Sequence, residues 1–165
     1  MVIDAKSGVS GAGRGGGEGT AFVTITENVS PYKPAGHRHR PEILEQLNGL
    51  APADIPSLTF VPHLVPVDQG ELVSCYVKSS VELVQEDLDK LYEARYLSEP
   101  FVKVADSAPG MRDVRDTNQC HIQAVAGDDR ILVFAAIDNL WKGSSGQAIQ
   151  NLNLILGLDE GMGLK

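Results

Sequence analysis

The segment His37-Arg38-His39-Arg40-Pro41-Glu42 has the densest group of side chains able to move protons or hold an anion. If it is extended, His37 and His39 point to the same side, because side chains alternate along an extended chain. Glu42 is close enough in sequence to orient one imidazole. Three interpretations remain open: a proton-transferring histidine beside arginines that hold an anion, a metal site, and an exposed basic segment that caps a helix.

A glycine-rich loop, residues 8–19, contains seven of the chain's 17 glycines. Residues 11–16 match the pattern G-x-G-x-x-G, but a dinucleotide site also requires a helix that opens at the last glycine. The following residues alternate as a strand does, so the sequence argues against a dinucleotide site. The loop is then a flexible hairpin connection, or an anion-binding loop to which Ser7, Ser10 and Arg14 contribute donors.

Predicted strands and helices must position these two segments. Alternating and β-branched residues predict strands at about 2–5, 20–27, 57–65, 71–79, 101–105, 119–126 and 131–138. Apolar periodicity and capping residues predict helices at about 41–49, 83–97 and 145–156. Gly127 marks an antiparallel hairpin between the last two strands. The pattern favours an α+β fold, with a largely antiparallel mixed sheet and helices on one face.

The predicted helices carry positional signals of their own. Pro41 suits the first helical position of the first helix, where no N–H partner is needed. The second helix has an apolar stripe made of Val84, Leu88, Leu91, Tyr92 and Arg95. The third has a stripe made of Ala148, Leu152, Ile155 and Leu156. Each stripe predicts a face that packs on apolar surface.

Composition excludes several classes of function. The chain has 165 residues, 42% of them hydrophobic, which suffices for the core of one domain. Its 14 Lys and Arg against 22 Asp and Glu give no cationic field, so we expect neither nucleic acid nor an anionic membrane as a partner. Cys75 and Cys120 do not form a disulfide framework and are expected to be reduced and buried. Without a signal-like start, a cytoplasmic location is expected.

Four blocks of sequence resemble the C-terminal part of the N-acetyl-gamma-glutamyl-phosphate reductase family, in the family's order. They are KSGVSGAGR at 6–14, YK leading to HRHRPEI at 32–43, FVPHLVP at 60–66, and DNLWKGSSGQAIQNLNL at 138–154. The resemblance covers residues 3–164. It implies an NADP-dependent acyl-phosphate reductase that forms a semialdehyde in arginine biosynthesis.

The resemblance also implies an architecture. Members of the family have an N-terminal Rossmann domain and a second domain of the glyceraldehyde-3-phosphate-dehydrogenase C-terminal type. Residues 1–142 then correspond to the substrate-binding and dimerisation domain. Residues 143–165 correspond to a C-terminal helix that packs on the NADP-binding domain. A homodimer or higher homo-oligomer formed through the sheet is expected by the same analogy.

Residue roles follow from the resemblance position by position. In the family a thiolate attacks the acyl phosphate, phosphate leaves, and a hydride reduces the thioester while a histidine moves protons. His37 matches that catalytic histidine. The family's positions near the substrate are matched by Ser7, Ser10, Arg14, His39 and Glu42. Asn139 and Gln147 match positions near the cofactor, and the mechanism requires no metal.

The chain also departs from the family. The nucleophilic cysteine of the Gly-x-Pro-Gly-Cys motif and the Rossmann fingerprint do not occur in it, and neither Cys75 nor Cys120 lies in such a motif. Gln69 stands where the family often has arginine, and Gly15-Gly16-Gly17 loosens the glycine loop. A strand predicted immediately after Met1 also suggests a fragment. We therefore expect half of an active site and no reductase activity from the chain alone, because a histidine cannot form the thioester intermediate.

Two other functions stay open. Aspartate-semialdehyde dehydrogenase and the aminoadipate-pathway reductase perform the same chemistry on other acids, and motifs do not separate them from the first interpretation. A non-catalytic dimerisation or interaction module would also be consistent with a broad sheet.

Overall fold

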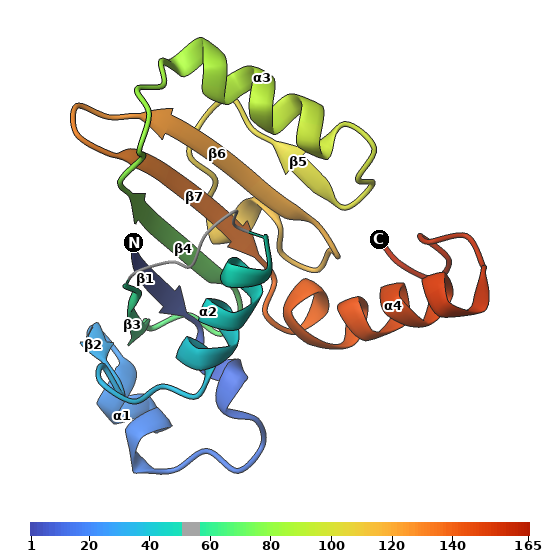
Figure 1. The fold of residues 1–165 in the computed structure, drawn as a ribbon. Coiled ribbons are helices and arrows are strands. Elements are labelled where there is room, and N and C mark those ends of the chain that lie inside the picture. Colours follow the sequence, from blue (N-terminus) through green and yellow to red (C-terminus); the bar gives the residue numbers. More distant parts are fainter. Residues whose placement is uncertain (51–56) are drawn as a thin grey trace.

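The computed structural model describes residues 1–50 and 57–165, whose strands form one sheet in the order β2-β3-β1-β4-β7-β6-β5 (Figure 1). The strands are β1 (Val2–Ser7), β2 (Ser30–Pro31), β3 (Thr59–Leu64), β4 (Glu71–Val77), β5 (Val102–Val104), β6 (Cys120–Ala126) and β7 (Ile131–Ile137). The helices are α1 (Phe22–Ile25), α2 (His39–Leu50), α3 (Gln85–Tyr96) and α4 (Gly146–Leu156). Single turns are η1 (Val9–Ala12), η2 (Glu18–Thr20), η3 (Met111–Asp113) and η4 (Trp141–Ser145).

The strand pairing confirms the predicted fold class. β1 pairs in parallel with β3, and β5 with β6, while the remaining pairs are antiparallel. β6 and β7 form the predicted hairpin, which closes with a 2.9 Å hydrogen bond from Gly127 N to Arg130 O. The two-residue strand β2 was not predicted, because so short a segment carries no alternation.

The strand predicted at 20–27 is wrong. Residues 18–20 form η2 and residues 22–25 form α1 instead. Phe22 and Val23 are exposed, so the alternation does not mark a face buried against a sheet. Thr24 Oγ1 donates to Glu18 O at 2.8 Å and Thr26 Oγ1 to Phe22 O at 2.7 Å. Local hydrogen bonds of this kind let threonine stabilise turns where no neighbouring strand is available.

Two helices cover one face of the sheet. α2 connects the parallel strands β1 and β3 and packs Ile43 and Leu44 on a core built from Ile3, Ala5, Leu58 and Phe60. α3 lies on β5 and β6, where Leu88 is its buried residue. Val84 and Leu91 of the predicted stripe are exposed, so this part of the stripe does not pack on the sheet.

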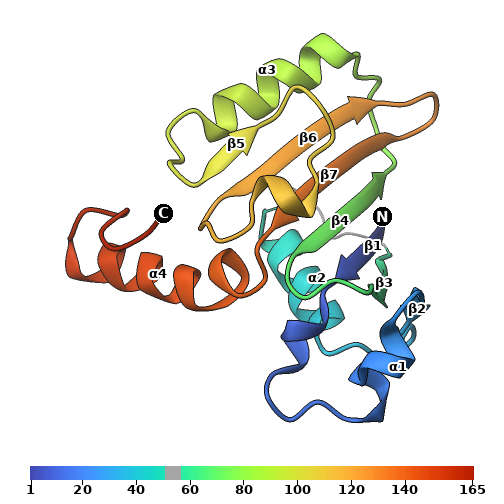
Figure 2. The ribbon, with the colours of Figure 1, turned by 180° about the vertical axis from the view of Figure 1, so that it is seen from behind.

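The opposite face carries no long helix among the described residues. In the view from behind, the one-turn η3 and its flanking loops cross β6 and β7, while β4 and β1 are uncovered (Figure 2). We call this side the open face. Strand register assigns to it, among others, Asp4, Lys6, His63, Leu72, Ser74, Tyr76, Leu132 and Phe134. Asp4 lies 2.9 Å from Lys6 Nζ and 3.0 Å from His63 Nδ1, so polar groups form part of this face.

The third predicted helix, α4, packs with its polar side inward. Its buried residues are Gly146, Gln150 and Asn153. Gln150 Oε1 accepts hydrogen bonds from Asn118 Nδ2 at 2.9 Å and from Lys142 Nζ at 2.6 Å. The predicted apolar stripe faces outward, with Ile155 79% and Leu156 61% exposed. α4 therefore presents an apolar surface that this chain does not cover, at one end of the sheet (Figure 1).

None of the helices within 1–50 and 57–165 has the length and apolar character that a membrane crossing requires.

Gly146→Ala is expected to destabilise the chain by about 1–3 kcal/mol, because added atoms strain a packed contact. A Cβ at Gly146 would lie 2.8 Å from Trp141 O and would collide with Asn118 Oδ1. Gly49 in α2 is the matched control: nothing lies within 4 Å of a Cβ there. Gly49→Ala should stabilise by about 0.5–1 kcal/mol. Urea unfolding of both variants measures the difference, and equal effects would contradict the packing of α4.

Candidate active site

Two chain segments that the sequence singled out lie at the same end of the sheet. β1 ends at Ser7 and continues into the glycine loop, while α2 begins at His39 and packs over β1 and β3. Glu71, the first residue of β4, stands opposite Ser7 in the strand register. Glu71 therefore lies beside the start of the glycine loop, and it also interacts electrostatically with His39.

The His37 ring lies in a cluster of aromatic rings. Its centroid is 5.4 Å from that of Tyr32, 4.8 Å from His39 and 5.3 Å from Phe60, all in edge-to-face geometry. The backbone N–H of His39 donates to His37 Nδ1 at 3.2 Å. An Nδ1 that accepts a hydrogen bond places the proton of the neutral ring on Nε2.

The surroundings of His37 favour the neutral ring. Burial lowers the pKa of His37 from its ordinary value, and the nearby His39, Lys33 and Arg38 lower it further. A neutral imidazole at pH 7 can share its Nε2 proton with an oxygen that gains negative charge. The geometry is thus compatible with the proton-transfer interpretation of the histidines.

Three details of the sequence interpretation were wrong here. Residues 34–36 and Arg38 lie in turns, so the segment is not extended as the alternation of His37 and His39 required, and the two rings meet edge to face. The exposed Glu42 forms no hydrogen bond or ion pair among the described residues, and the N–H of His39 orients His37 instead. Pro41 is the third helical residue, which a helix tolerates because its first N–H groups have no intrahelical partners.

Sequence reasoning missed Glu71 and Tyr32 as members of the cluster. Burial raises the pKa of the Glu71 carboxyl, and His39 partly offsets the shift. Burial also raises the pKa of Tyr32, and Glu71 adds to this effect. One signal in the sequence could have indicated Glu71 as a site residue. It is a charged residue at the first position of a strand that was predicted to lie inside the sheet.

Hydrogen bonds hold the first part of the glycine loop firmly. Gly8 N donates to Gly70 O at 2.9 Å, and Ser10 N donates to Asp68 O at 3.0 Å. Asn139 Nδ2 donates to Ser10 Oγ at 3.0 Å. A Cβ built on Gly11 would lie 3.6 Å from Asn139 Nδ2 and 3.7 Å from Ser7 Oγ. The structure thus brings three predicted site residues, Ser7, Ser10 and Asn139, together around η1.

The second part of the loop closes on itself. Thr20 Oγ1 and Thr20 N both donate to Gly17 O, at 3.0 Å each. A Cβ at Gly16 would lie 2.7 Å from Thr20 Oγ1, so this glycine permits a close approach. The argument that a strand follows the glycines was wrong, but α1 has four residues and begins at Phe22, past the last glycine of the motif. A helix this short, placed there, does not provide the dipole end that a dinucleotide site uses.

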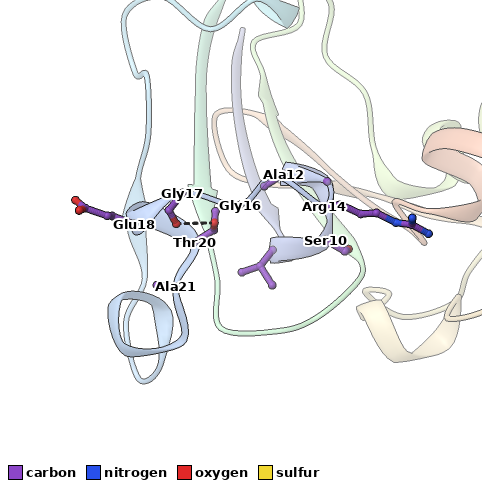
Figure 3. Close-up of a pocket in the computed structure, with 10 residues that line it drawn as sticks. Ser10, Ala12, Arg14, Gly16, Gly17, Glu18, Thr20 and Ala21 are labelled. Carbon is purple, nitrogen blue, oxygen red and sulfur yellow. Dashed lines mark hydrogen bonds between the residues drawn. The ribbon is translucent and has the colours of Figure 1, made fainter.

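The loop borders an open hollow of about 600 Å³. Its lining residues include Ser10, Arg14, Glu18 and Thr20 (Figure 3). The side chains of Arg14 and Glu18 extend in opposite directions away from the loop (Figure 3). His37 is not among the residues that line this hollow.

The remaining predicted residues lie around this arrangement. Gln147, in the first turn of α4, donates to Asn151 Oδ1 at 2.8 Å. Asn139 also accepts a hydrogen bond from Gly70 N at 2.6 Å. One N–H and one lone pair of its amide then have no hydrogen-bond partner among residues 1–50 and 57–165. The assignment of Asn139 and Gln147 to the cofactor stays a prediction.

Neither cysteine resembles a nucleophile. Cys75 and Cys120 are free thiols on the helix-covered side of β4 and β6, and burial raises the pKa of both. A thiol with a raised pKa is largely protonated at neutral pH and reacts slowly. Within residues 1–50 and 57–165, no three His, Cys, Asp or Glu side chains are grouped as a metal site.

A comparison with family models defines the family of the chain. Residues 1–139 match the model of the semialdehyde dehydrogenase dimerisation domain. The chain therefore belongs to this domain family.

The curated relatives carry one name. The chain is 43% identical to N-acetyl-gamma-glutamyl-phosphate reductase of Dehalococcoides mccartyi, 49% to that of Desulforudis audaxviator and 48% to that of Azotobacter vinelandii. Each match covers 99% of this chain and 48–49% of the relative. The chain therefore spans about half the length of the curated relatives it matches.

Solved structures support the fold. Aspartate semialdehyde dehydrogenase II from Vibrio cholerae superposes with a TM-score of 0.72 at 16% identity, over 94% of this chain and 55% of that one. A probable aspartate-semialdehyde dehydrogenase from Pseudomonas aeruginosa gives a TM-score of 0.70 at 15% identity, with the same coverage. At these identities the likeness concerns the fold.

Proposed function

We propose that this chain is the substrate-binding and dimerisation half of an NADPH-dependent reductase that converts N-acetyl-glutamyl 5-phosphate to N-acetyl-glutamate 5-semialdehyde. We refer to the protein that contains this chain together with a cofactor-binding half as the whole reductase. The observation that carries the proposal is the alignment of almost the entire chain with reductases of that name at 43–49% identity. A cytoplasmic location is part of the same proposal.

Residues of this chain would handle the proton and the substrate. His37, kept neutral by its surroundings, would share its Nε2 proton with the acyl oxygen as that oxygen gains negative charge. Ser7, Ser10 and the Arg14 guanidinium would hold the anionic end of the acyl phosphate. His39 fixes the ring of His37 through its backbone N–H, and Glu42 would face the same side from the first turn of α2.

Two parts of the reaction would come from outside this chain. The described residues do not fit a dinucleotide site of their own, since the helix after the glycine loop has four residues. NADP, which supplies the hydride when bound, is therefore assigned mainly to the other half, with Asn139 and Gln147 as the contacts from this side. The nucleophilic thiol is likewise assigned to the other half, because burial raises the pKa of both Cys75 and Cys120.

The proposal includes a division of the chain into two parts. Residues 1–142 contain the sheet with its two covering helices, and residues 143–165 contain α4. The exposed stripe of α4, with Leu152, Ile155 and Leu156, would dock on the cofactor-binding half. A surface of this kind stabilises domain contacts by removing apolar area from water.

We also infer that two copies of the chain pair through the open face. The domain family is described as a dimerisation domain, and no long helix of the described residues covers the open face. Closed two-fold pairing is the commonest arrangement of soluble oligomers.

Arg14→Ala is expected to raise KM for the acyl phosphate by about 10-fold or more in the whole reductase, since a charge-assisted contact of about 1.5–3 kcal/mol is lost. The value of kcat should change little, because Arg14 is exposed and does not contact the His37 cluster. Arg130→Ala is the matched control, an exposed arginine in the β6–β7 turn paired with Asp129. Steady-state kinetics measure KM and kcat of both variants. An unchanged KM in Arg14→Ala would overturn the substrate role of the loop.

A further inference from the structure

Asp138, the residue directly after β7, is a fully buried carboxylate with four hydrogen-bond donors. Its Oδ1 accepts from the backbone N–H of Leu140 at 2.8 Å and of Trp141 at 3.2 Å. Its Oδ2 accepts from the backbone N–H of Asp116 at 2.8 Å and from Gln69 Nε2 at 3.1 Å. Both oxygens are thus saturated by donors, which is how a protein stabilises a buried carboxylate.

The four donors belong to three separate segments. Gln69 lies in the loop before β4, Asp116 in the segment after η3, and Leu140 and Trp141 in the turn that leads into α4. Asp116 has a positive φ of 59°, a conformation that costs free energy for a residue with a Cβ. Its hydrogen bond to Asp138 helps to hold that conformation, and Gln69 Nε2 also reaches Asp116 Oδ1 at 2.8 Å.

Asn139 extends this network to the glycine loop. Its Oδ1 accepts from Gly70 N at 2.6 Å, while its Nδ2 donates to Ser10 Oγ at 3.0 Å. Gly8, Val9 and Ser10 in turn donate their backbone N–H groups to carbonyl oxygens of residues 67–70. The position of Ser10 therefore depends on two neighbours, the 67–70 loop and Asn139. Asp138 holds the 67–70 loop through the side chain of Gln69. It also holds Asn139, because the two residues are adjacent in the chain.

We propose that Asp138 is a positioning residue, which holds the substrate loop in register with the start of α4 by tying the 67–70 loop and the turn before α4 to one carboxylate. The part of this proposal that concerns substrate rests on the proposed function of the loop. Asp138 itself is fully enclosed, so it acts through Asn139 and Gln69 and does not contact the substrate.

Asp138→Asn tests the proposal with minimal change of shape. An amide nitrogen cannot accept hydrogen bonds, so two of the four donors lose their acceptor. We expect the amides of Gly8, Val9 and Ser10 to exchange with deuterium at least about 10-fold faster in the 165-residue chain, while the amides of α3 keep their wild-type rates. Asp128→Asn, in the exposed β6–β7 turn, is the matched control and should leave the loop amides unchanged.

Two results would overturn the positioning role. One is unchanged exchange in the loop, and the other is a uniform increase over the whole sheet, which would indicate general destabilisation. If Asp138→Asn does not fold, Asn139→Ala is the second variant. It removes the hydrogen bonds of the turn with Gly70 and with Ser10, while Asp138 keeps its four donors. Faster exchange of the loop amides in Asn139→Ala supports the proposal, and unchanged exchange overturns it.

Kinetics of the whole reductase separate the two parts of the argument. With the loop as substrate site, Asp138→Asn should raise KM for the acyl phosphate about 10-fold with a smaller change in kcat. Faster loop exchange with an unchanged KM would keep Asp138 as a positioning residue and contradict the proposed substrate role of the loop. Unchanged exchange would refute the positioning role whatever the kinetics.

Discussion

Replacing His37 with asparagine is expected to lower kcat of the whole reductase by about 100-fold or more, the usual contribution of a proton-transferring side chain. The variant is informative because the amide oxygen of asparagine can take the place of Nδ1 and keep the hydrogen bond from His39 N–H. The Nε2 position, which carries the proton in the neutral ring, is lost. The change thus separates the chemistry of His37 from its structural contact.

The pH profile provides a second measure of the same residue. Burial and neighbouring cations lower the pKa of His37, so the ring stays neutral to a more acidic pH than an ordinary histidine. Protonation would place a proton on Nδ1 and break the hydrogen bond from His39. Activity should therefore be retained through neutral pH and fall on acidification at a pH below about 6.5, the ordinary histidine value. The acid limb should disappear in His37→Asn.

His121→Asn is the control for both measurements. His121 lies on β6, and burial lowers its pKa as it does for His37, but it is not part of the ring cluster. Its replacement should leave kcat and the acid limb unchanged. Equal turnover in the wild type and His37→Asn would remove His37 from the mechanism.

Tyr76→Glu is expected to weaken dimerisation by about 100-fold or more, equivalent to about 2.7 kcal/mol. Tyr76 lies on β4, the middle strand of the sheet, and register places it on the open face beside Leu132. A carboxylate at the centre of a paired surface would lose water without gaining a partner. Sedimentation equilibrium over a range of concentrations measures the change.

The matched control for Tyr76→Glu introduces the same charge on the other side of the molecule. Leu91 of α3 is 55% exposed on the helix-covered side, so Leu91→Glu should leave the association constant unchanged. Circular dichroism of both variants verifies that the monomer is folded. If Tyr76→Glu stays as dimeric as the wild type, the open face is not the interface.

The sheet was largely predictable because its strands carry local signals. The run from Ile131 to Phe134 and the turn at Gly127 define the last hairpin without any tertiary information. Residues 20–27 show the limit of this reasoning, since alternation indicates a strand only where a neighbouring strand accepts its hydrogen bonds. The parallel pairing of β1 with β3 depends on contacts distant in sequence, which periodicity does not encode.

The sequence predicted individual residues of the candidate site, but it did not predict which other residues they contact. Motifs indicated His37 and Ser10, yet their partners came from elsewhere: a backbone N–H for His37 and Asn139 for Ser10. Glu71 stands beside the glycine loop through strand register, which no motif encodes. Asp138 opens one of the four sequence blocks, but the block does not indicate the hydrogen bond that Gln69 donates to it. The inward polar side of α4 also escaped prediction, because an apolar stripe does not reveal which side of a helix its own domain covers.

The most direct test of the central claim is the rate of acyl-phosphate-dependent NADPH oxidation by the 165-residue chain and by the whole reductase, measured side by side. Our account predicts turnover by the whole reductase with N-acetyl-glutamyl 5-phosphate and none by the chain alone, which lacks a reactive thiol beside His37. Turnover by the chain alone would contradict the account, as would a whole reductase that does not reduce this acyl phosphate.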